Sequence, residues 1–504
     1  MVSRDSLEHM RSRVGSILGL ALGLYAPAAW AIGNEGAPID TSDYTIDLHQ
    51  GPVTGGSRVI GLAGAYEAIA EGILATQYNP AAVALRVPWS QTWFDWEVDG
   101  GASFPASLSD FDYDNNGDGR FTNSAALFLT GALGFQMGGG GIGLTADYQL
   151  YQLDSRTGDD VGIDVSILRV LLVGGYAFLD GEIVTGIGVG ANAIDLDRSG
   201  SLLSGNETTI ASITGPTFHA GIVWAPAYAS LRIGLSGRGS LPASALPDAR
   251  PECSPPNCEQ VGDDYISEGF YLPRTITLPN EIRAGVAYQF FRPLNLRWTD
   301  PDEDRLFAEA AERAISRQRR QRGIDRRDAM LEAQRRGHSL SAVESRHDRI
   351  DEAAIEAEED QLDEAEEADR HRRLMIYKAL PRPKLLIAAG AKVTLQTVDG
   401  VGLESFLEQV VERSGEKVTV QPHAALETEV WPGYITLRGG SYLEPTRFRR
   451  GEPRFHGTGG LDIRIPIEWS IFGLLDDDTT FRISGAVDGA PRYFGWGAGI
   501  GIWR

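Results

Sequence analysis

Long runs of alternating apolar and polar residues constrain the fold of this chain more than any other feature. From position 461 to 471 every odd position is apolar, whereas Asp462, Arg464 and Glu468 occupy even positions. The segment 282–290 alternates in the same way, with its even positions apolar. Because successive side chains of a β-strand point to opposite faces, each run predicts a strand with one apolar and one polar face.

The length and number of these runs favour a membrane barrel over a soluble sandwich. Soluble strands cluster near five or six residues, whereas a strand tilted across a bilayer needs roughly nine to eleven. Candidate strands lie near 90–99, 124–136, 140–154, 163–178, 182–196, 208–224, 229–238, 282–291, 384–397, 418–430, 434–444, 459–473, 479–487 and 492–503. An even number of antiparallel strands can close without an unpaired edge in lipid. We therefore predict an all-β fold, a transmembrane antiparallel β-barrel of about 14 strands over residues 90–504, with an N-terminal plug and a charged helical insertion.

Short connections alternate with longer ones between the predicted strands. The segments 137–139, 179–181 and 431–433 are turn-like, whereas 100–123 and 239–281 are long. Outer-membrane barrels have short periplasmic turns and longer external loops. With both termini in the periplasm, the short connections of this chain would be the periplasmic ones.

Charge and glycine content narrow the class of protein. The chain has 46 basic and 69 acidic residues, a net charge of −23, which argues against nucleic acid as a partner. Its 60 glycines suit a barrel, where tight turns and closely packed backbones need them. Beyond the N-terminal region no run of about 18 apolar residues occurs, so we expect no transmembrane helix.

Residues 1–31 have the features of a secretory signal peptide. Basic residues precede an apolar run over 14–29, and Ala29-Trp30-Ala31 forms a small-residue cleavage site. We predict cleavage after Ala31. The alternative is an uncleaved anchor, which the short run and its Pro27 disfavour. The exported chain would then lie in the bacterial outer membrane, in contact with its lipid.

The two cysteines, Cys253 and Cys258, lie close together with two prolines between them. In an oxidising compartment this spacing favours a local disulfide bond. Two unpaired thiols or a two-ligand metal site are the alternatives.

Residues 301–378 interrupt the barrel pattern with a charged helical insertion. Its first half is rich in arginine and its second in glutamate and aspartate, so antiparallel pairing in a hairpin would bring opposite charges together. Gly337 would end the first helix, and Ser341 with Glu344 would form a capping box for the second. Strand counting places the insertion in the periplasm, where it offers a surface to a protein partner. The alternative is a solvated, partly disordered insertion, because apolar anchors are sparse.

The segment DFDYDNNGDGRFTN contains the first half of a calcium-loop pattern. Oxygen ligands occur at alternate positions, and Gly117 stands where the sharp turn is needed. The candidate ligands are Asp112, Asp114, Asn116 and Asp118. The last ligand position holds Asn123 instead of an acid, so a water-exposed Asx turn is the alternative. We expect no other cofactor.

Charged residues on the inward faces of the predicted strands must meet a lumen or one another, because lipid would not solvate them. They are Arg232, Arg238, Arg283, Lys392, Arg438, Asp462, Arg464, Glu468, Arg482 and Asp488. Ion pairs that brace a filled barrel are one interpretation, and a polar channel lining is the other. His423 shares a strand face with Glu427 and Glu429, but no GxSxG-type nucleophile setting accompanies it, so we predict that the chain is not an enzyme.

The segment from 58 to 85 is small and apolar, and it lies between the signal peptide and the first strand. Glycines let backbones pass closely, and the Asn-Pro step fixes a turn and stops a helix. Such a segment fits inside a barrel as a plug, which we assign to 32–89. Its key residues are Gly61, Gly64, Tyr66, Tyr78, Asn79 and Pro80. The alternative is a surface helix that leads into the first strand.

This Gly/Ala stretch ending in Tyr78-Asn79-Pro80-Ala81 resembles the FadL/TodX-like family of outer-membrane transporters. The resemblance implies an N-terminal hatch and passive uptake of hydrophobic small molecules, such as long-chain fatty acids. The charged insertion is foreign to the usual transporter, so an interaction barrel that anchors or shuttles secreted proteins is an alternative function. An outer-membrane hydrolase would be a third, and it would need a nucleophile next to His423.

Overall fold

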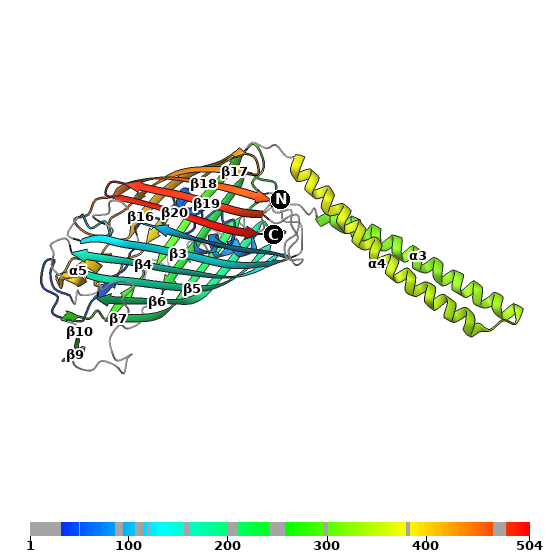
Figure 1. Ribbon diagram of the computed structural model, residues 1–504, viewed down its shortest axis with the longest axis horizontal. Coiled ribbons are helices and arrows are strands. Elements are labelled where there is room, and N and C mark those ends of the chain that lie inside the picture. The colour runs from blue at the N-terminus through cyan, green and yellow to red at the C-terminus, as the bar shows by residue number, and fades with distance from the viewer. Residues whose placement is uncertain are drawn as a thin grey trace, which may run out of the picture.

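Fourteen antiparallel strands close into a barrel in the computed structural model of the protein (Figure 1). Each strand pairs with its neighbours in chain order, and β2 (Phe94–Phe104) pairs with β20 (Tyr493–Trp503) to complete the ring. The other strands are β3 (Phe121–Met137), β4 (Gly140–Ser155), β5 (Gly162–Phe178), β6 (Ile183–Arg198), β7 (Thr209–Trp224), β8 (Leu231–Ser240), β13 (Glu281–Phe290), β14 (Leu385–Thr394), β16 (Thr419–Trp431), β17 (Ile435–Glu444), β18 (Arg454–Pro466) and β19 (Thr480–Ala490). The predicted fold class and strand number are confirmed.

The structure describes residues 32–49, 51–85, 94–105, 112, 114–117, 121–155, 162–198, 209–240, 258–267, 269–295, 301–379, 384–466 and 480–503. The predicted signal peptide lies outside these residues. None of the helices within them is long and apolar enough to cross a membrane.

The outer face of the barrel is apolar. Side chains such as Leu144, Leu172, Val189, Ile233, Ile387, Leu437 and Ile483 point outward and are exposed. Aromatic side chains gather at one end, namely Phe94, Phe135, Tyr176, Phe178, Trp224, Tyr288, Phe290, Trp431 and Tyr434. An apolar band bordered by an aromatic girdle is the surface of a barrel that spans a bilayer.

The two ends of the barrel carry different structures. A long helical pair leaves the end at which β13 and β20 finish, which we name the hairpin end (Figure 1). The opposite, loop end carries α5 (Leu403–Glu408) and two small sheets. One sheet is parallel, with β1 (Thr45–Asp47) between β12 (Thr275–Thr277) and β15 (Gly400–Val401). The other contains β9 (Cys258–Val261), β10 (Asp264–Ser267) and β11 (Phe270–Tyr271).

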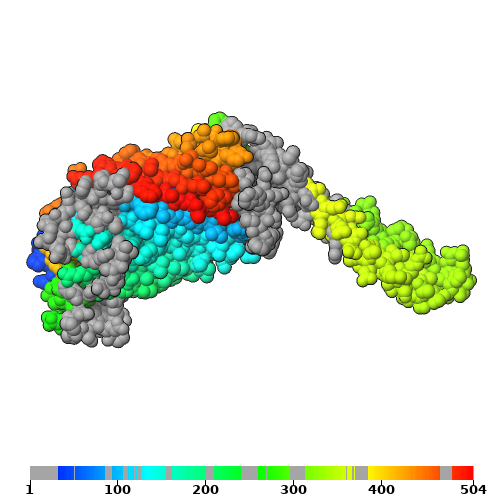
Figure 2. Space-filling model, viewed as in Figure 1, coloured from blue at the N-terminus to red at the C-terminus, as the bar shows by residue number. Residues whose placement is uncertain are grey.

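Helices α3 (Pro301–Arg336) and α4 (Leu340–Ala379) form an antiparallel pair that projects away from the barrel (Figures 1 and 2). Opposite charges join them: Glu358 of α4 accepts from Arg319 at 2.9 Å and from Arg322 at 2.5 Å. Farther along, Arg326 donates to Asp348 at 2.8 Å. The arginine-rich and acid-rich halves therefore meet, which is the arrangement that their charges favour.

The start of α4 differs from the predicted capping box. The helix begins at Leu340, and Ser339 Oγ accepts from the backbone N–H of Ala342 at 3.4 Å. Ser339 is thus the cap, whereas Ser341 already lies within the first turn and contacts the Ser339 hydroxyl at 2.8 Å. The cap must precede the helix to reach an N–H three residues on, and Ser339 meets that condition.

Residues 51–85 run through the interior of the barrel. They form α2 (Ser57–Gly61) and two 3₁₀ turns, η1 (Ile73–Gln77) and η2 (Pro80–Ala84), and almost every residue from Gly56 to Leu85 is buried. Buried apolar residues of this segment pack against inward residues of the wall, such as Leu171 and Val223. The segment is a plug, not a surface helix.

The apolar outer face can be tested by placing a charge on it. We expect Leu172→Arg, near the middle of β5, to reduce the free energy of unfolding in lipid vesicles by about 2–4 kcal/mol, because lipid does not solvate the guanidinium. The matched control is Leu179→Arg, in the turn after β5. We expect it to reduce the free energy of unfolding by only roughly 0–1 kcal/mol. Urea titration of the vesicle-inserted barrel measures both, and equal effects would contradict the membrane orientation of this strand.

Candidate functional site

The inner wall of the barrel is shaped to receive the plug. Four inward-facing glycines, Gly141, Gly186, Gly221 and Gly234, lie directly against it. A Cβ on any of them would lie 2.0 to 2.3 Å from an atom of the plug, which is far inside contact distance. Glycine at these positions therefore lets the plug and the strands approach more closely than any larger residue would.

The Asn-Pro step joins the plug to the wall. Asn79 Nδ2 donates to the carbonyl of Glu67 at 3.0 Å and to that of Ile222 in β7 at 3.2 Å. Its Oδ1 accepts from the N–H of Ala81 at 3.1 Å and so caps η2, whose first residue is Pro80. Proline suits that position, because its missing N–H would have no helical partner there. The Tyr-Asn-Pro-Ala segment is thus a structural corner of the plug.

The other predicted plug residues also fix its shape. Tyr66 donates to the carbonyl of Glu71 at 2.6 Å, and Tyr78 donates to that of Thr54 at 2.7 Å. Gly64 has a positive φ of 77°, which favours glycine. Gly61 packs against Gly460 of β18, so that two backbones meet without side chains between them.

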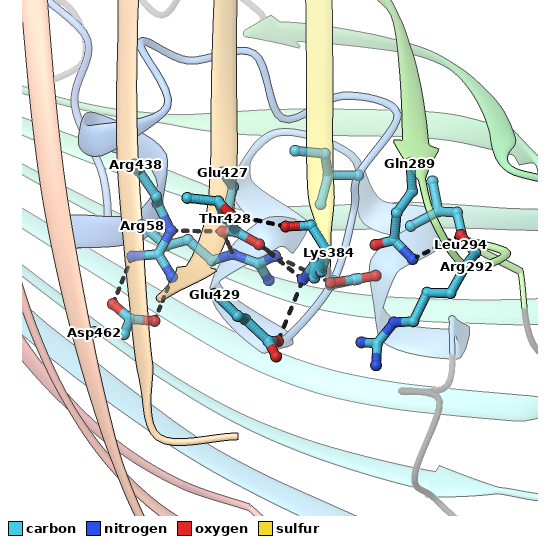
Figure 3. Close-up of polar contacts among 12 residues, drawn as sticks. Arg58, Gln289, Arg292, Leu294, Lys384, Glu427, Thr428, Glu429, Arg438 and Asp462 are labelled. Carbon is cyan, nitrogen blue, oxygen red and sulfur yellow. Dashed lines mark hydrogen bonds and ion pairs between the residues drawn. The ribbon is translucent and has the colours of Figure 1, made fainter. Parts of the chain in front are cut away.

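Buried ion pairs hold the plug in place at its hairpin-end side (Figure 3). Arg58 of α2 donates to both carboxylate oxygens of Glu427 in β16 at 3.0 Å and to Glu71 at 3.1 Å. Arg232 of β8 donates to Glu71 at 3.0 Å and to the carbonyl of Ile69 at 2.9 Å. We name these four side chains (Arg58, Glu71, Arg232 and Glu427) the latch.

Glu427 is the centre of the latch. It is fully buried and also accepts from Arg438 at 2.6 Å and from Lys384 at 3.0 Å. Arg438 in turn makes two hydrogen bonds to Asp462. Three cations around one carboxylate satisfy charges that would otherwise be costly to bury. Of the two interpretations of the inward charges, ion pairs that brace a filled barrel describe this region. Glu468 lies outside the described residues.

A second set of ion pairs lies around Glu281 at the start of β13. Its carboxylate contacts Arg238 at 2.8 Å, Arg283 at 2.9 Å and Lys392 at 3.8 Å. The guanidinium of Arg283 also lies over the ring of Tyr78, 4.2 Å from the ring centroid. The ion pairs join β8, β13 and β14, and Arg283 connects them to the plug through Tyr78.

His423 contacts neither Glu427 nor Glu429, the acidic residues on its strand face, but a residue of the plug. Its Nε2 lies 3.1 Å from Glu67 of the plug, whereas Glu427 belongs to the latch. Sequence analysis also missed a buried group near the loop end, where His456 lies between Asp488 at 2.9 Å and Glu444 at 2.7 Å. Strand alternation places these residues inward, but only the register shows that they meet.

The lumen becomes apolar in its loop half. Here the inward side chains of the wall are Tyr151, Leu153, Ile163, Val165, Ile167, Ile194, Leu196 and Ile213. They form one cluster with Ile46 and Leu48 from the N-terminal segment and Phe406 of α5. Along β4 to β7, the interior above the charged latch is therefore lined by hydrophobic side chains, whereas β17 to β19 carry the buried Glu444, His456 and Asp488 there.

A small cavity lies beside the plug at the hairpin end. Ile73, Val83, Leu85 and Trp96 form its apolar side, and Arg58, Glu71, Arg464 and Arg482 are among its charged residues. Its volume is about 50 Å³, enough for a few water molecules but well below the roughly 300–1,000 Å³ of ordinary ligand pockets. The cavity beside the plug is thus small, with a mixed apolar and charged lining.

The predicted calcium ligands are only partly described, because Asp118 lies outside the described residues. Asp112 Oδ1 accepts from the N–H of Gly117 at 3.2 Å, and Asp114 Oδ1 accepts from that of Asn116, also at 3.2 Å. The bond between Asp114 and Asn116 is that of an Asx turn, whereas the bond from Gly117 to Asp112 closes a longer turn. In the part of the chain that the structure describes, no group of three or more His, Cys, Asp or Glu residues is arranged to hold a metal ion. Calcium binding stays a prediction.

The predicted disulfide cannot be followed either, since Cys253 lies outside the described residues. Cys258 begins β9, but its side chain is not among those described.

No protein-family model matches the sequence, and no curated protein matches it either. Solved structures of similar shape include a FadL homologue from Pseudomonas aeruginosa, at 11% identity, with 90% of this chain and 98% of that chain covered and a TM-score of 0.47. The toluene transporter TbuX from Ralstonia pickettii matches at 11% identity, 90% and 98% coverage and a TM-score of 0.42. The CymD monoaromatic hydrocarbon channel matches at 10% identity, 90% and 97% coverage and a TM-score of 0.42.

The chain is an outer-membrane barrel. Its own features decide this: a closed antiparallel ring of strands, an apolar outer face and an aromatic girdle. The identities and TM-scores of the solved structures are low, so we transfer no substrate from them.

The close fit between wall and plug predicts that a larger side chain destabilises the barrel at Gly186 but not at Gly174. We expect Gly186→Val to destabilise the closed barrel by about 1–3 kcal/mol, because the new side chain would overlap the backbone of Pro80. Gly174→Val is the control, since a Cβ there meets no atom within 4 Å. Unfolding in detergent by urea gives both values. An unchanged midpoint for Gly186→Val would show that the plug does not press against β6.

The calcium prediction is testable through Asp114. Burial raises the pKa of this carboxyl, and so does the neighbouring charge of Asp112. Protons should therefore compete with the ion, so that calcium affinity rises with pH. We expect millimolar Ca²⁺ to slow hydrogen exchange over 112–117. Asp114→Asn should abolish that protection, and protection that is absent from the unaltered protein at pH 8 would contradict the prediction.

Proposed function

We propose that the protein mediates passive uptake of hydrophobic small molecules across the outer membrane and is not an enzyme. The apolar lining of the loop half of the lumen is the observation that carries this proposal. Water-filled porins have polar interiors. In this barrel Ile163, Val165 and Ile167 point inward from β5 and are almost fully buried. Such a lining attracts molecules that leave water readily, because burial of apolar surface is favourable.

The plug supplies a closed state for this route. It occupies the lumen below the apolar cluster, and its latch consists of charges and hydrogen bonds. A buried ion pair contributes little net stability, because desolvation offsets much of the attraction, yet it fixes the position of the groups. Interactions of this kind can be exchanged for water when the lumen opens. The latch therefore suits a plug that moves.

Long-chain fatty acids are the substrate class that we favour. The cavity beside the plug places the side chains of Ile73, Val83 and Leu85 next to those of Arg58 and Arg482. An amphipathic molecule with an alkyl chain and a carboxylate has partners on both sides of such a space. A neutral aromatic hydrocarbon would use only the apolar side.

Uptake by whole cells tests the proposal. The protein is expressed in a bacterial host that lacks its own fatty-acid transporter, and uptake of radiolabelled oleate is compared with uptake of toluene. We expect oleate uptake well above that of the empty host. Ile167→Thr, which faces the lumen, should lower it at least fivefold, whereas Leu168→Thr on the outer face should not. Oleate and toluene uptake equal to the empty host, with the barrel present in the membrane, would contradict the proposed function.

An interaction barrel is the second candidate, and the α3–α4 hairpin favours it. Its longer helix has 40 residues and extends about 60 Å at 1.5 Å per residue. Apolar side chains of both helices, such as Ile324, Leu331 and Ile355, are exposed on the hairpin. A photo-reactive residue at Ile355 would cross-link a secreted protein if the hairpin anchors one, and Leu179 at the barrel turn is the control position. The same cross-linked proteins at Ile355 and at Leu179 would argue against this candidate.

A further inference from the structure

Residues that flank the α3–α4 hairpin on both sides in the chain contact residues that hold the plug. The first contact precedes α3, where Arg232 of the latch donates from Nε to Asn295 Oδ1 at 2.6 Å. The same guanidinium donates to the carbonyl of Leu294 at 3.1 Å. Its remaining nitrogen, Nη1, binds Glu71 and the carbonyl of Ile69 in the plug. One side chain thus joins the segment before the hairpin to the plug.

The second contact follows α4. Lys384 Nζ lies 3.0 Å from Oε1 of Glu427, and Arg58 Nη2 of the plug lies 3.0 Å from the same oxygen (Figure 3). Lys384 is itself buried, and its carbonyl accepts from Thr428 at 2.9 Å. The residue after the hairpin and the plug therefore share one carboxylate.

We infer that the hairpin controls the plug, and that its two attachment points act together on the latch. This inference rests on the proposed function for its purpose, because a plug that never opens needs no control. Displacement of Leu294 and Asn295 removes two acceptors from Arg232, which then no longer fixes Glu71. Displacement of Lys384 removes a cation from Glu427, whose position orients Arg58. Both changes loosen the same part of the plug, residues 58–71.

The hairpin is built to transmit such a displacement. Glu358 binds Arg319 and Arg322, and Arg326 binds Asp348 and Asp351, so the two helices are tied together over 319–326 of α3 and 348–358 of α4. A tilt of the pair would then act on both attachment points, which flank it in the chain. A periplasmic protein that grips the hairpin would release the plug without touching the barrel.

Hydrogen exchange of the plug tests this inference without any transport. The full chain in detergent micelles is compared with Lys384→Met, and exchange of the amides from 58 to 75 is measured by mass spectrometry. We expect at least fivefold faster exchange in Lys384→Met. Lys417→Met, an exposed lysine near the loop end, is the matched control and should leave exchange unchanged. Exchange at the wild-type rate in Lys384→Met would overturn the inference.

A second variant tests the hairpin itself. Glu358→Lys places a cation beside Arg319 and Arg322 and should separate the helices, which faster exchange within α3 would verify. We expect it to speed plug exchange at least threefold, whereas the exposed Glu356→Lys should not. In the double variant Glu358→Lys/Lys384→Met, exchange should be faster than in Lys384→Met alone but by less than the product of the two single effects, because only the attachment at Asn295 remains to transmit the change. Separated helices with unchanged plug exchange would overturn the inference.

The uptake assay keeps the two proposals apart. Faster plug exchange in Lys384→Met together with no uptake of oleate or toluene by the unaltered protein would support the control of the plug and contradict the transport function. Normal uptake with unchanged exchange would do the reverse.

Discussion

The closed state of this barrel depends on the ion pairs of the Glu427 carboxylate. Its partners are Arg58 of the plug, Arg438 of the wall and Lys384, which lies between the hairpin and β14 in the chain. A charge in the lumen of a filled barrel has little access to water, so it is stable only when its partners surround it. The three partners come from segments that are far apart in the chain, and their common carboxylate fixes where these segments lie relative to one another.

The division of the lumen follows from the same constraint. Around the plug, inward positions include glycines that admit its backbone, apolar residues that pack against it and charged residues that bind it. In the loop half of β4 to β7, inward positions hold large apolar side chains, which form one cluster with residues of the N-terminal segment and α5. Polar binding thus sets the position of the plug, whereas the hydrophobic effect fills the space above it. A molecule that entered from the loop end would meet the apolar half first and the latch second.

Much of the fold can be predicted from sequence because a period of two is a strong signal when strands are long. The strands of the barrel match the predicted segments closely, although β18 begins at Arg454, five residues before the predicted start at 459, because the small residues Gly457 and Thr458 obscure its alternation. The pair Glu427–Arg438 is also readable, since the two residues are equally far from the turn at 432–433 and face each other across β16 and β17.

The other contacts of Glu427 could not be predicted from the sequence in this way. Arg58 reaches Glu427 from the plug, so neither strand register nor spacing relates the two residues. Lys384 stands at the start of the predicted strand 384–397, but only the pairing of β14 with β16 brings it beside Glu427. His423 shows the same limit, because its partner Glu67 also comes from the plug. Contacts between the wall and its filling depend on how the plug folds inside the lumen, and a plug without periodic structure leaves no pattern in the sequence.

The position of the hairpin in the barrel order has a physical consequence. It joins β13 to β14, and β8 and β16 are the strands that flank this pair in the ring. Arg232 lies on β8 and Glu427 on β16, so the two wall residues of the latch stand on either side of the place where the hairpin is inserted. An insertion at the turn between β3 and β4 would project from the same end of the barrel but would be remote from both residues. The insertion site therefore places the hairpin next to the wall residues that bind the plug. A hairpin that only offered a surface to a partner protein could be inserted at any turn of this end.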